Sequence, residues 1–364
     1  MAGSEQVLDA MLECYPGSPV FALVDDPAAF DPGSYIARAE VRTSFIQRLP
    51  KATTAYRLYL PFMPFAVEQF DLDGFEVVVS NVKAVAHGAL TGPGQLHVAY
   101  VNRPMRYAWD LYHQEVRDFG RRSRVKGPLA RIILHYLRLW DREAMQRPDV
   151  LATNSRTVQA LVWKYYRRDT EVIHPPVNVD SFSPSRDRAD YFVSVARLVP
   201  YKRVDVVVRA FNELGLPLKV IGDGPLEDRL RALAKPNVEF LGWIPTIEVR
   251  RHLERARALV FAADEEFGIA PVEAQAAGAP VIAYGKGGAT ETVVEGETGI
   301  LFPAQSPASL AEAVRAFVSG RYRFRVEAIR TNAERFSRQR FQERFSSFLD
   351  RSLESFVNGS GRSG

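Results

Sequence analysis

The sequence predicts an α/β fold made of two domains, each built around a parallel β-sheet. Its 364 residues are long for a single domain and sufficient for two. Short apolar runs typical of buried strands alternate with helical stretches in both halves of the chain. Between the halves, Pro175-Pro176 and the residues after it suit a stiff interdomain connector. The predicted parts are a first domain at 1–176, a second at 177–335, a terminal helix at 336–357 and a Gly/Ser-rich disordered tail at 358–364.

Composition restricts the class of protein. Hydrophobic residues make up 46% of the chain and charged residues 25%, as in ordinary globular proteins. The single cysteine, Cys14, excludes an internal disulfide framework and a zinc site built from cysteines, and it indicates a reducing, cytoplasmic setting. No apolar run approaches the ~20 residues that a membrane-spanning helix needs.

The net charge of +4 is distributed unevenly along the chain. Between Arg117 and Arg147 there are nine Lys or Arg residues and three Asp or Glu residues. Such a face attracts anionic lipid, although a solvated charged surface is the more common outcome. We expect peripheral contact with the inner face of an anionic membrane and no nucleic-acid partner. Four of these residues suit a bilayer surface or a lipid diphosphate: Arg121, Arg122, Arg124 and Lys126.

The first half opens with a predicted helix from Gly3 to Leu12. Strands are predicted at 20–24, 76–80, 96–101 and 150–155, and Asn154 or Ser155 can cap the helix that follows the last of them. A long helix is expected over 128–145, where apolar residues recur at helical spacing. We expect this stripe to be core and not a membrane contact; its residues are Leu129, Ile132, Ile133, Tyr136, Leu137 and Trp140.

The second half repeats the alternation of strand and helix. Apolar runs predict strands at 191–196, 218–221, 238–241, 258–263 and 281–284. Helices are expected from about residue 203, from about 270 to a stop at Gly278, over 307–318 and over about 323–356.

The stretch 264–283 carries most of the chemical information. It reads as an acidic glycine loop after a strand, then a helix, and in parallel sheets such loops lie where ligands bind. Gly268 lets the backbone approach a ligand, and the helix start offers N–H groups to a diphosphate. Glu265 and Glu273 are eight positions apart and suit hydroxyl groups of the same ligand. A plain helix with an acidic first turn is the alternative, but it leaves the glycine-rich loop at 285–288 unexplained.

The spacing Glu265-x7-Glu273, followed by Ala-x-Ala-x-Gly-x-Pro-Val-Ile-Ala, resembles the donor-site motif of retaining glycosyltransferases of family 4. The sequence of this stretch is most similar to mannosyl- and rhamnosyltransferase-like members that build bacterial polysaccharides. The resemblance implies the GT-B fold, in which two Rossmann-like, doubly wound domains face a cleft. It also implies that the terminal helix at 336–357 crosses back onto the first domain. It further implies a nucleoside-diphosphate sugar as donor, without a further cofactor. No Asp-x-Asp metal motif stands at a strand end, and Arg197 and Lys202 make a divalent ion unnecessary, so we expect no metal ion.

The resemblance assigns donor-side roles to the second domain. Arg197-x4-Lys202 matches the diphosphate pair of the family, whereas the residues alone fit a charged surface loop equally well. Glu273 is expected to hold ribose hydroxyls and Glu265 the donor sugar. The remaining residues implied near the nucleotide sugar are Gly222, Gly224, Trp243, Ile244, Phe267, Gly268, Ile269 and Ala270.

The acceptor side is expected in the first domain. Asn102 stands where the family has a histidine; it can hydrogen-bond a sugar hydroxyl but cannot shuttle a proton. Family members also begin with a strand before the turn that resembles Gly3-Ser4, so we expect the true start to lie upstream of Met1. The candidate acceptor residues are Gly3, Ser4, Arg103, Arg106, Tyr107 and Trp109.

The sequence thus predicts a retaining, metal-independent transferase that moves a hexose or deoxyhexose, mannose-like, to a saccharide, lipid-linked or natural-product acceptor. Two alternatives remain open: an epimerase or phosphorylase on the same fold, and a non-catalytic nucleotide-binding relative. The acidic glycine loop argues against the first. The joint presence of Glu265, Glu273, Arg197 and Lys202 argues against the second.

Overall fold

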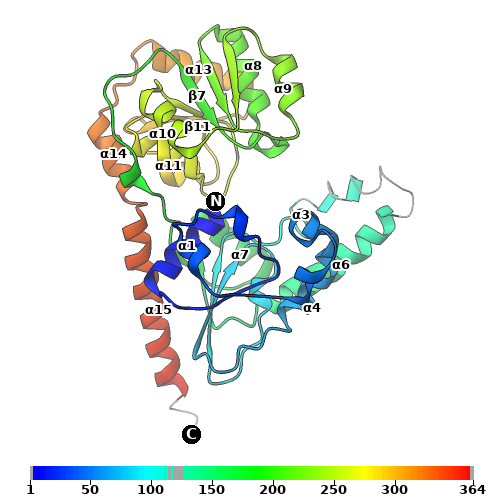
Figure 1. Ribbon diagram of the computed structural model, residues 1–364. Helices are drawn as coiled ribbons and strands as arrows, with labels where there is room; N and C mark the ends of the chain where they lie inside the picture. The colour runs from blue at the N-terminus through cyan, green and yellow to red at the C-terminus, as the bar shows by residue number, and fades with distance from the viewer. Residues whose placement is uncertain (1–2, 111, 114–115, 118–125, 361–364) are drawn as a thin grey trace. The chain divides into compact units, whose positions relative to one another are not determined.

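The computed structural model describes residues 3–110, 112–113, 116–117 and 126–360, and the chain divides into two compact units (Figure 1). One unit is Met1–Pro175 with Phe341–Gly364, and the other is Pro176–Arg340. The unit boundary after Pro175 lies one residue from the predicted position. The basic residues Arg121, Arg122 and Arg124 lie outside the described residues.

The second unit is built on a six-stranded parallel sheet. Its strand order is β12-β11-β10-β7-β8-β9, so the order reverses between β7 and β10. This is the doubly wound arrangement in which the crevice at the reversal binds ligands. The strands are β7 (Phe192–Val195), β8 (Leu218–Ile221), β9 (Val238–Gly242), β10 (Leu259–Phe261), β11 (Val281–Tyr284) and β12 (Gly299–Phe302).

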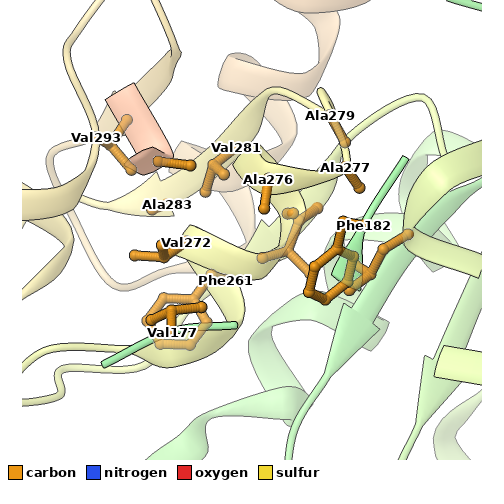
Figure 2. Packing of buried hydrophobic residues seen from close by; sticks show 14 of the residues in the cluster. Val177, Phe182, Phe261, Val272, Ala276, Ala277, Ala279, Val281, Ala283 and Val293 are labelled. Atoms are coloured by element: carbon orange, nitrogen blue, oxygen red, sulfur yellow. The ribbon is translucent and has the colours of Figure 1, made fainter. Parts of the chain in front are cut away.

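Helices cover both faces of this sheet because its strands are apolar on both sides. On β10, Leu259 and Phe261 face one core and Val260 faces the other, as the period of two along a strand requires. Figure 2 shows the first core, where Phe261 packs near Val272. The helices are α8 (Val204–Leu214), α9 (Glu227–Leu233), α10 (Thr246–Arg255), α11 (Ile269–Ala276), α12 (Ala289–Thr292), α13 (Pro307–Val318) and α14 (Val326–Glu334).

The first unit is also α/β, with a less regular plan. Its main sheet has four parallel strands in chain order: β3 (Val77–Val82), β4 (Leu96–Val101), β5 (Val150–Thr153) and β6 (Glu171–Val172). A separate parallel pair is formed by β1 (Val20–Ala22) and β2 (Val41–Thr43), and sequence reasoning missed β2. The predicted strand at 20–24 therefore does not join the main sheet.

The helices of the first unit again lie on two faces. Residues of α1 (Gly3–Cys14) and α15 (Arg338–Ser360) share one core with β4, and α7 (Arg156–Tyr166) shares another with its opposite side. Ser155 caps α7 by accepting a hydrogen bond from the Val158 N–H group, as predicted. The long helix α6 (Lys126–Ala144) packs on short helical segments that include η2 (Phe45–Arg48) and α4 (Met63–Val67).

The predicted C-terminal helix over 323–356 is wrong in one respect, because it is two helices. The chain breaks between α14 and α15, where the Val177 backbone donates to Phe336 O (2.9 Å) and accepts from Arg338 N (3.1 Å). These bonds replace helical ones at the break. The predicted tail at 358–364 is also partly wrong, since α15 continues to Ser360 and extending an existing helix needs no new nucleus. Residues 361–364 lie outside the described residues.

Among the described helices, none is both long enough and apolar enough to span a bilayer.

Candidate active site

The candidate donor site lies at the carboxyl ends of β7, β10 and β11. Strand β10 pairs in parallel with both β7 and β11, so the loops that follow these three strands are neighbours. The loop after β7 carries Arg197 and Lys202, and the loop after β10 carries Glu265. The structure therefore brings together, within one unit, residues that stand more than 60 positions apart in the sequence.

Lys202 and Glu265 form an ion pair across two of these loops. Their side chains are 19% and 15% exposed, so the pair is largely shielded from water. A shielded pair is stronger than one on an open surface. The group predicted to hold diphosphate is thus in direct contact with the group predicted to hold the donor sugar.

Arg197 has a different environment from Lys202. Its side chain is exposed, and it forms no ion pair with any other residue that the structure describes. Its loop is fixed by the backbone, since Ala196 N donates to Ile221 O (3.0 Å) and Leu198 N donates to Asp223 O (2.7 Å). A guanidinium on a fixed loop, without a carboxylate partner among the described residues, is well prepared to bind an anion.

Gly222 and Gly224 explain how the Arg197 loop is held. Both have positive φ angles, and an added Cβ would lie 2.1 Å from Ala196 O at Gly222 and 2.6 Å from Leu198 O at Gly224. Only glycine permits this backbone-to-backbone approach. The sequence predicted these glycines at the nucleotide; the geometry gives them a supporting role beneath the Arg197 loop.

The Glu265 loop is supported in the same way by Gly287 and Gly288. Gly288 N donates to Glu265 O (2.7 Å), and a Cβ at Gly288 would lie 2.2 Å from the Phe267 Cα and O atoms. A Cβ at Gly287 would lie 2.3 Å from Glu265 O. Sequence reasoning noted this glycine-rich loop without assigning it a role. Consecutive glycines directly after a strand were the available signal.

The start of α11 offers main-chain groups to a ligand. Gly268 precedes the helix with a φ of 82°, and no side chain among the described residues caps the helix start, which leaves N–H groups near Ile269 and Ala270 for an anion. The Phe267 side chain, predicted beside the sugar, is instead buried, and its ring packs at 5.4 Å from that of Phe336. Phe267 can therefore present only its main chain to a ligand.

Glu273 lies one turn into α11 and is partly buried. Burial raises the pKa of its carboxyl to about 7, and the positive charge of Arg250 on α10 opposes that rise. The Arg250 guanidinium lies 5.7 Å from the centre of the Phe182 ring, and its Nε atom is buried. Sequence reasoning missed Arg250, which carries no motif and becomes relevant only through the packing of α10 beside α11.

Trp243 and Ile244 follow β9, the edge strand of the sheet. Trp243 is 72% exposed, whereas Ile244 packs against the core that contains Phe261. An indole so exposed is available to stack on a flat ring.

In the first unit, the predicted acceptor residue Asn102 belongs to a row of hydrogen-bonded side chains at the strand ends. The Asn102 amide donates to Asn81 Oδ1 (2.5 Å) and to Val82 O (3.2 Å). Asn81 in turn donates to Ser4 O (2.7 Å) in the first turn of α1, which Gly3 opens, and Asn154 donates to Asn102 O (2.9 Å). Asn102 thus links β3, β4 and β5, and its amide NH₂ group is engaged within the protein.

The rest of the predicted acceptor loop is also tied into the protein. Arg103 pairs with Asp110 (2.5 Å), and Asp110 also accepts from the Tyr165 hydroxyl. The Trp109 ring stacks on Tyr165 at 4.5 Å, and its N–H group donates to the buried Asp141 (2.8 Å). These contacts hold the loop against α6 and α7. The other two predicted residues, Arg106 and Tyr107, are partly buried.

Comparison with solved structures defines the class of fold. The chain is similar to a sucrose-phosphate synthase from Thermosynechococcus elongatus, with a TM-score of 0.72 over 96% of this chain and 92% of that one at 16% identity. It is also similar to Anabaena Alr3699/HepE in complex with UDP, with a TM-score of 0.67 over 96% of both chains at 17% identity. The chain has the GT-B fold, as predicted.

Sequence comparison finds relatives of the second unit. Residues 179–336 match the model of Glycosyl transferases group 1, which confirms the predicted resemblance to that family. The chain is 34% identical over 185 residues to a GDP-mannose-dependent alpha-(1-6)-phosphatidylinositol monomannoside mannosyltransferase of Mycobacterium tuberculosis, covering 42% of this chain and 48% of the relative. It is 28% identical over 222 residues to the D-rhamnosyltransferase WbpZ of Pseudomonas aeruginosa, covering 56% of each. The chain therefore spans about half the length of these relatives.

Proposed function

We propose that this protein transfers a hexose or deoxyhexose from a nucleoside-diphosphate sugar to a hydroxyl group of an acceptor. The observation that carries the proposal is the Lys202–Glu265 contact at the strand ends of a group 1 domain, which unites an anion-binding and a hydroxyl-binding side chain. A relative named as GDP-mannose-dependent and another named as a rhamnosyltransferase support a mannose-like donor sugar.

The proposed chemistry follows from the charges of the site. The bond between the anomeric carbon and the diphosphate oxygen breaks, and a bond from that carbon to the acceptor oxygen forms through an oxocarbenium-like transition state. Arg197 and Lys202 stabilise the negative charge that develops on the leaving diphosphate, together with the N–H groups near Ile269. Glu265 accepts hydrogen bonds from the donor sugar and Glu273 from the ribose.

We further propose that the configuration of the sugar is retained and that the acceptor proton passes to an oxygen of the departing phosphate. The amide of Asn102 has no titratable proton, so it takes no part in the proton transfer. Because Arg197, and Lys202 once it leaves Glu265, can neutralise the diphosphate, the reaction needs no divalent ion, and we expect activity to persist in EDTA.

The acceptor is proposed to be a saccharide, a lipid-linked saccharide or a hydroxylated natural product. The protein is proposed to act in the cytoplasm and at the inner face of an anionic membrane. The single cysteine and the basic stretch between Arg117 and Arg147 support this setting.

A thermal-shift panel tests the donor side directly. Wild type and Lys202→Ala are each mixed with nucleoside diphosphates and nucleotide sugars, because a ligand that binds only the folded state raises the Tm. We expect one nucleotide to raise the Tm of the wild type and to do so much less in Lys202→Ala. Failure of every nucleotide to shift well-folded wild type would remove the proposal.

A turnover assay separates transfer from the alternatives. With the donor found in the panel, release of nucleoside diphosphate that depends on an added acceptor indicates a transferase. Conversion of the donor without acceptor indicates an epimerase, and nucleotide binding without any turnover across the acceptor classes indicates a non-catalytic relative.

A further inference from the structure

Helix α6 carries apolar side chains on two different faces. Ala130, Leu134 and Leu137 are buried in the first unit, as a core-facing stripe should be. The residues Leu129, Ile132, Tyr136 and Leu139, at steps of three and four, are 52%, 67%, 48% and 60% exposed. The predicted apolar stripe of this helix was therefore half right, since Ile133, Leu137 and Trp140 turn inward while Leu129, Ile132 and Tyr136 turn outward.

A second group of exposed apolar side chains lies in the short helical segments before α6. Its members, with exposed fractions from 37% to 70%, are Phe45, Tyr56, Leu58, Phe62 and Phe65. The rings of Phe45 and Phe65 lie 5.8 Å apart, so these two form one patch. Scattered single hydrophobic residues are normal on a surface, but groups of this kind mark an interaction site.

The two groups are attached to one core. Ile46, Met63 and Val67 from the earlier segment are buried in the same cluster as Leu134 and Leu137 of α6. Figure 1 draws α3 (Ala52–Ala55), α4 and α6 together at one side of the first unit. The two exposed groups therefore belong to a single body.

The charges around these residues have one dominant sign. Residues 44–67 contain Arg48, Lys51 and Arg57, all exposed, and no Asp or Glu. On α6, Arg131 and Arg142 are exposed and Arg138 is partly exposed, whereas Asp141 is buried. Glu143 is the one exposed acidic side chain of the described helix. Exposed apolar and exposed cationic side chains thus occur together on these two segments, with Glu143 as the single exposed acidic side chain among the described residues of 44–67 and α6.

We propose that this surface, made of the exposed apolar residues of α6 and of segment 45–65 with their flanking arginines, docks on an anionic lipid bilayer. The apolar side chains enter the boundary between headgroups and acyl chains, and the guanidinium and ammonium groups contact lipid phosphates. A second copy of the chain is a poorer occupant, because it would bring arginine against arginine. The docking does not depend on the proposed sugar transfer, because it needs no donor.

Vesicle co-sedimentation of the purified full chain tests this inference. Vesicles of phosphatidylcholine alone are compared with vesicles containing phosphatidylglycerol, without any sugar nucleotide. We expect the wild type to sediment with the anionic vesicles and to be released as salt is raised, because charged surfaces are screened. Binding should fall by at least about tenfold in Ile132→Glu/Leu139→Glu and in Phe62→Ser/Phe65→Ser, since both remove apolar insertion.

The matched control is Trp163→Glu on α7. Trp163 is 50% exposed on the same unit but lies outside the proposed surface, so this variant should bind vesicles as the wild type does. All variants should stay close to the wild-type Tm, because the altered side chains are 50% to 67% exposed. Equal sedimentation of wild type and both double variants would overturn the proposal. A concentration-dependent dimer that Ile132→Glu/Leu139→Glu abolishes, without vesicle binding by the wild type, would assign the surface to a second copy instead.

Discussion

The strand-end loops of the two units are held in place by different means. In the second unit, glycines let one loop backbone lie directly on the next, as Gly222 does at Ala196 and Gly288 does at Phe267. In the first unit, side chains hold the loops together, as Asn102 does through Asn81. Backbone support leaves the Arg197 side chain without an ion-pair partner among the described residues, whereas side-chain support engages the amide of Asn102.

This difference affects which of the two units can bind an anionic ligand tightly. Arg197 has no ion-pair partner among the described residues, while Arg103, at the corresponding kind of loop, is paired with Asp110. A group that already has a partner must exchange it to bind a ligand, and it gains less by doing so. The donor side is therefore prepared to bind an anion, and the predicted acceptor loop is built first for stability.

The largest expected effect comes from removing backbone support. In Gly288→Ala the new Cβ meets the Phe267 main chain at 2.2 Å, so the Glu265 loop must move. We expect a loss of about 1–3 kcal/mol in the free energy of unfolding, as for other overpacked sites. Activity should fall by about 100-fold or more, because small displacements of a site are costly.

Gly285→Ala in the same loop is the matched control for Gly288→Ala. Its Cβ would lie 3.4 Å from the nearest atom, which is ordinary contact. Chemical denaturation and turnover should both remain close to wild type. If both alanine variants behave alike, backbone approach is not what holds the Glu265 loop.

The next largest effect is expected from replacing Arg197, and it should differ from the effect of replacing Arg103. Arg197→Ala should weaken nucleoside-diphosphate binding by about tenfold or more, the size of a hydrogen bond to a charged group, and leave the Tm unchanged. Arg103→Ala should lower the Tm, because it breaks the pair with Asp110, and leave nucleotide affinity unchanged. Calorimetric titration measures the nucleotide affinity of both variants, and thermal melting measures their Tm. A lower Tm in Arg197→Ala, with an unchanged Tm in Arg103→Ala, would contradict the assigned roles.

The same contrast explains how much the sequence could predict. Local sequence patterns predict the alternation of strands and helices, the donor loop and its charged residues. They can do so because residues close together in the sequence determine the main-chain geometry and the positions of the glycines. The burial of Phe267, the engagement of Trp109 with Asp141 and the position of Arg250 depend on which distant elements pack together. The pairing of β1 with β2 likewise depends on a contact between two separate strands. Neither three-residue segment identifies its partner strand from its own sequence.

A smaller effect is expected from the ion pair itself. Lys202 must leave Glu265 before it can serve a diphosphate, so the pair competes with the ligand. Glu265→Gln removes that competitor, and we expect nucleoside-diphosphate affinity to rise by about fivefold or more, because even an exposed ion pair can be worth roughly 1 kcal/mol. Turnover of the nucleotide sugar should fall, because the sugar loses its carboxylate.

Asp264→Asn controls for the change in net charge. Asp264 pairs with Lys286, whose side chain is 64% exposed, and this lysine is not assigned to the diphosphate. Its loss should leave diphosphate affinity near that of the wild type. Calorimetric titration decides, and weaker diphosphate binding in Glu265→Gln would contradict the competition.

The smallest effect should appear in the pH dependence and concerns Glu273. Because burial raises its pKa to about 7, the folded protein holds this proton over a pH range in which the unfolded chain, with a carboxyl pKa near the ordinary 4.5, has lost it. A raised acid pKa makes stability fall as the pH increases from about 4.5 to 7, since the folded state binds more protons there. The Glu273→Gln variant should lack this fall in stability and should be more stable than the wild type at pH 8. Chemical denaturation of both proteins at about pH 4.5 and at pH 8 can measure this difference.

Nucleotide binding should have the opposite pH dependence. Ribose hydroxyls donate more strongly to a carboxylate than to a carboxylic acid, so wild-type affinity should rise by about threefold between pH 6 and pH 8. Glu273→Gln should show no such rise, and Arg250→Ala should move it to higher pH, because the positive charge of Arg250 lowers the pKa of Glu273. A rise that persists in Glu273→Gln would assign the titration to another group, such as the phosphate of the nucleotide itself.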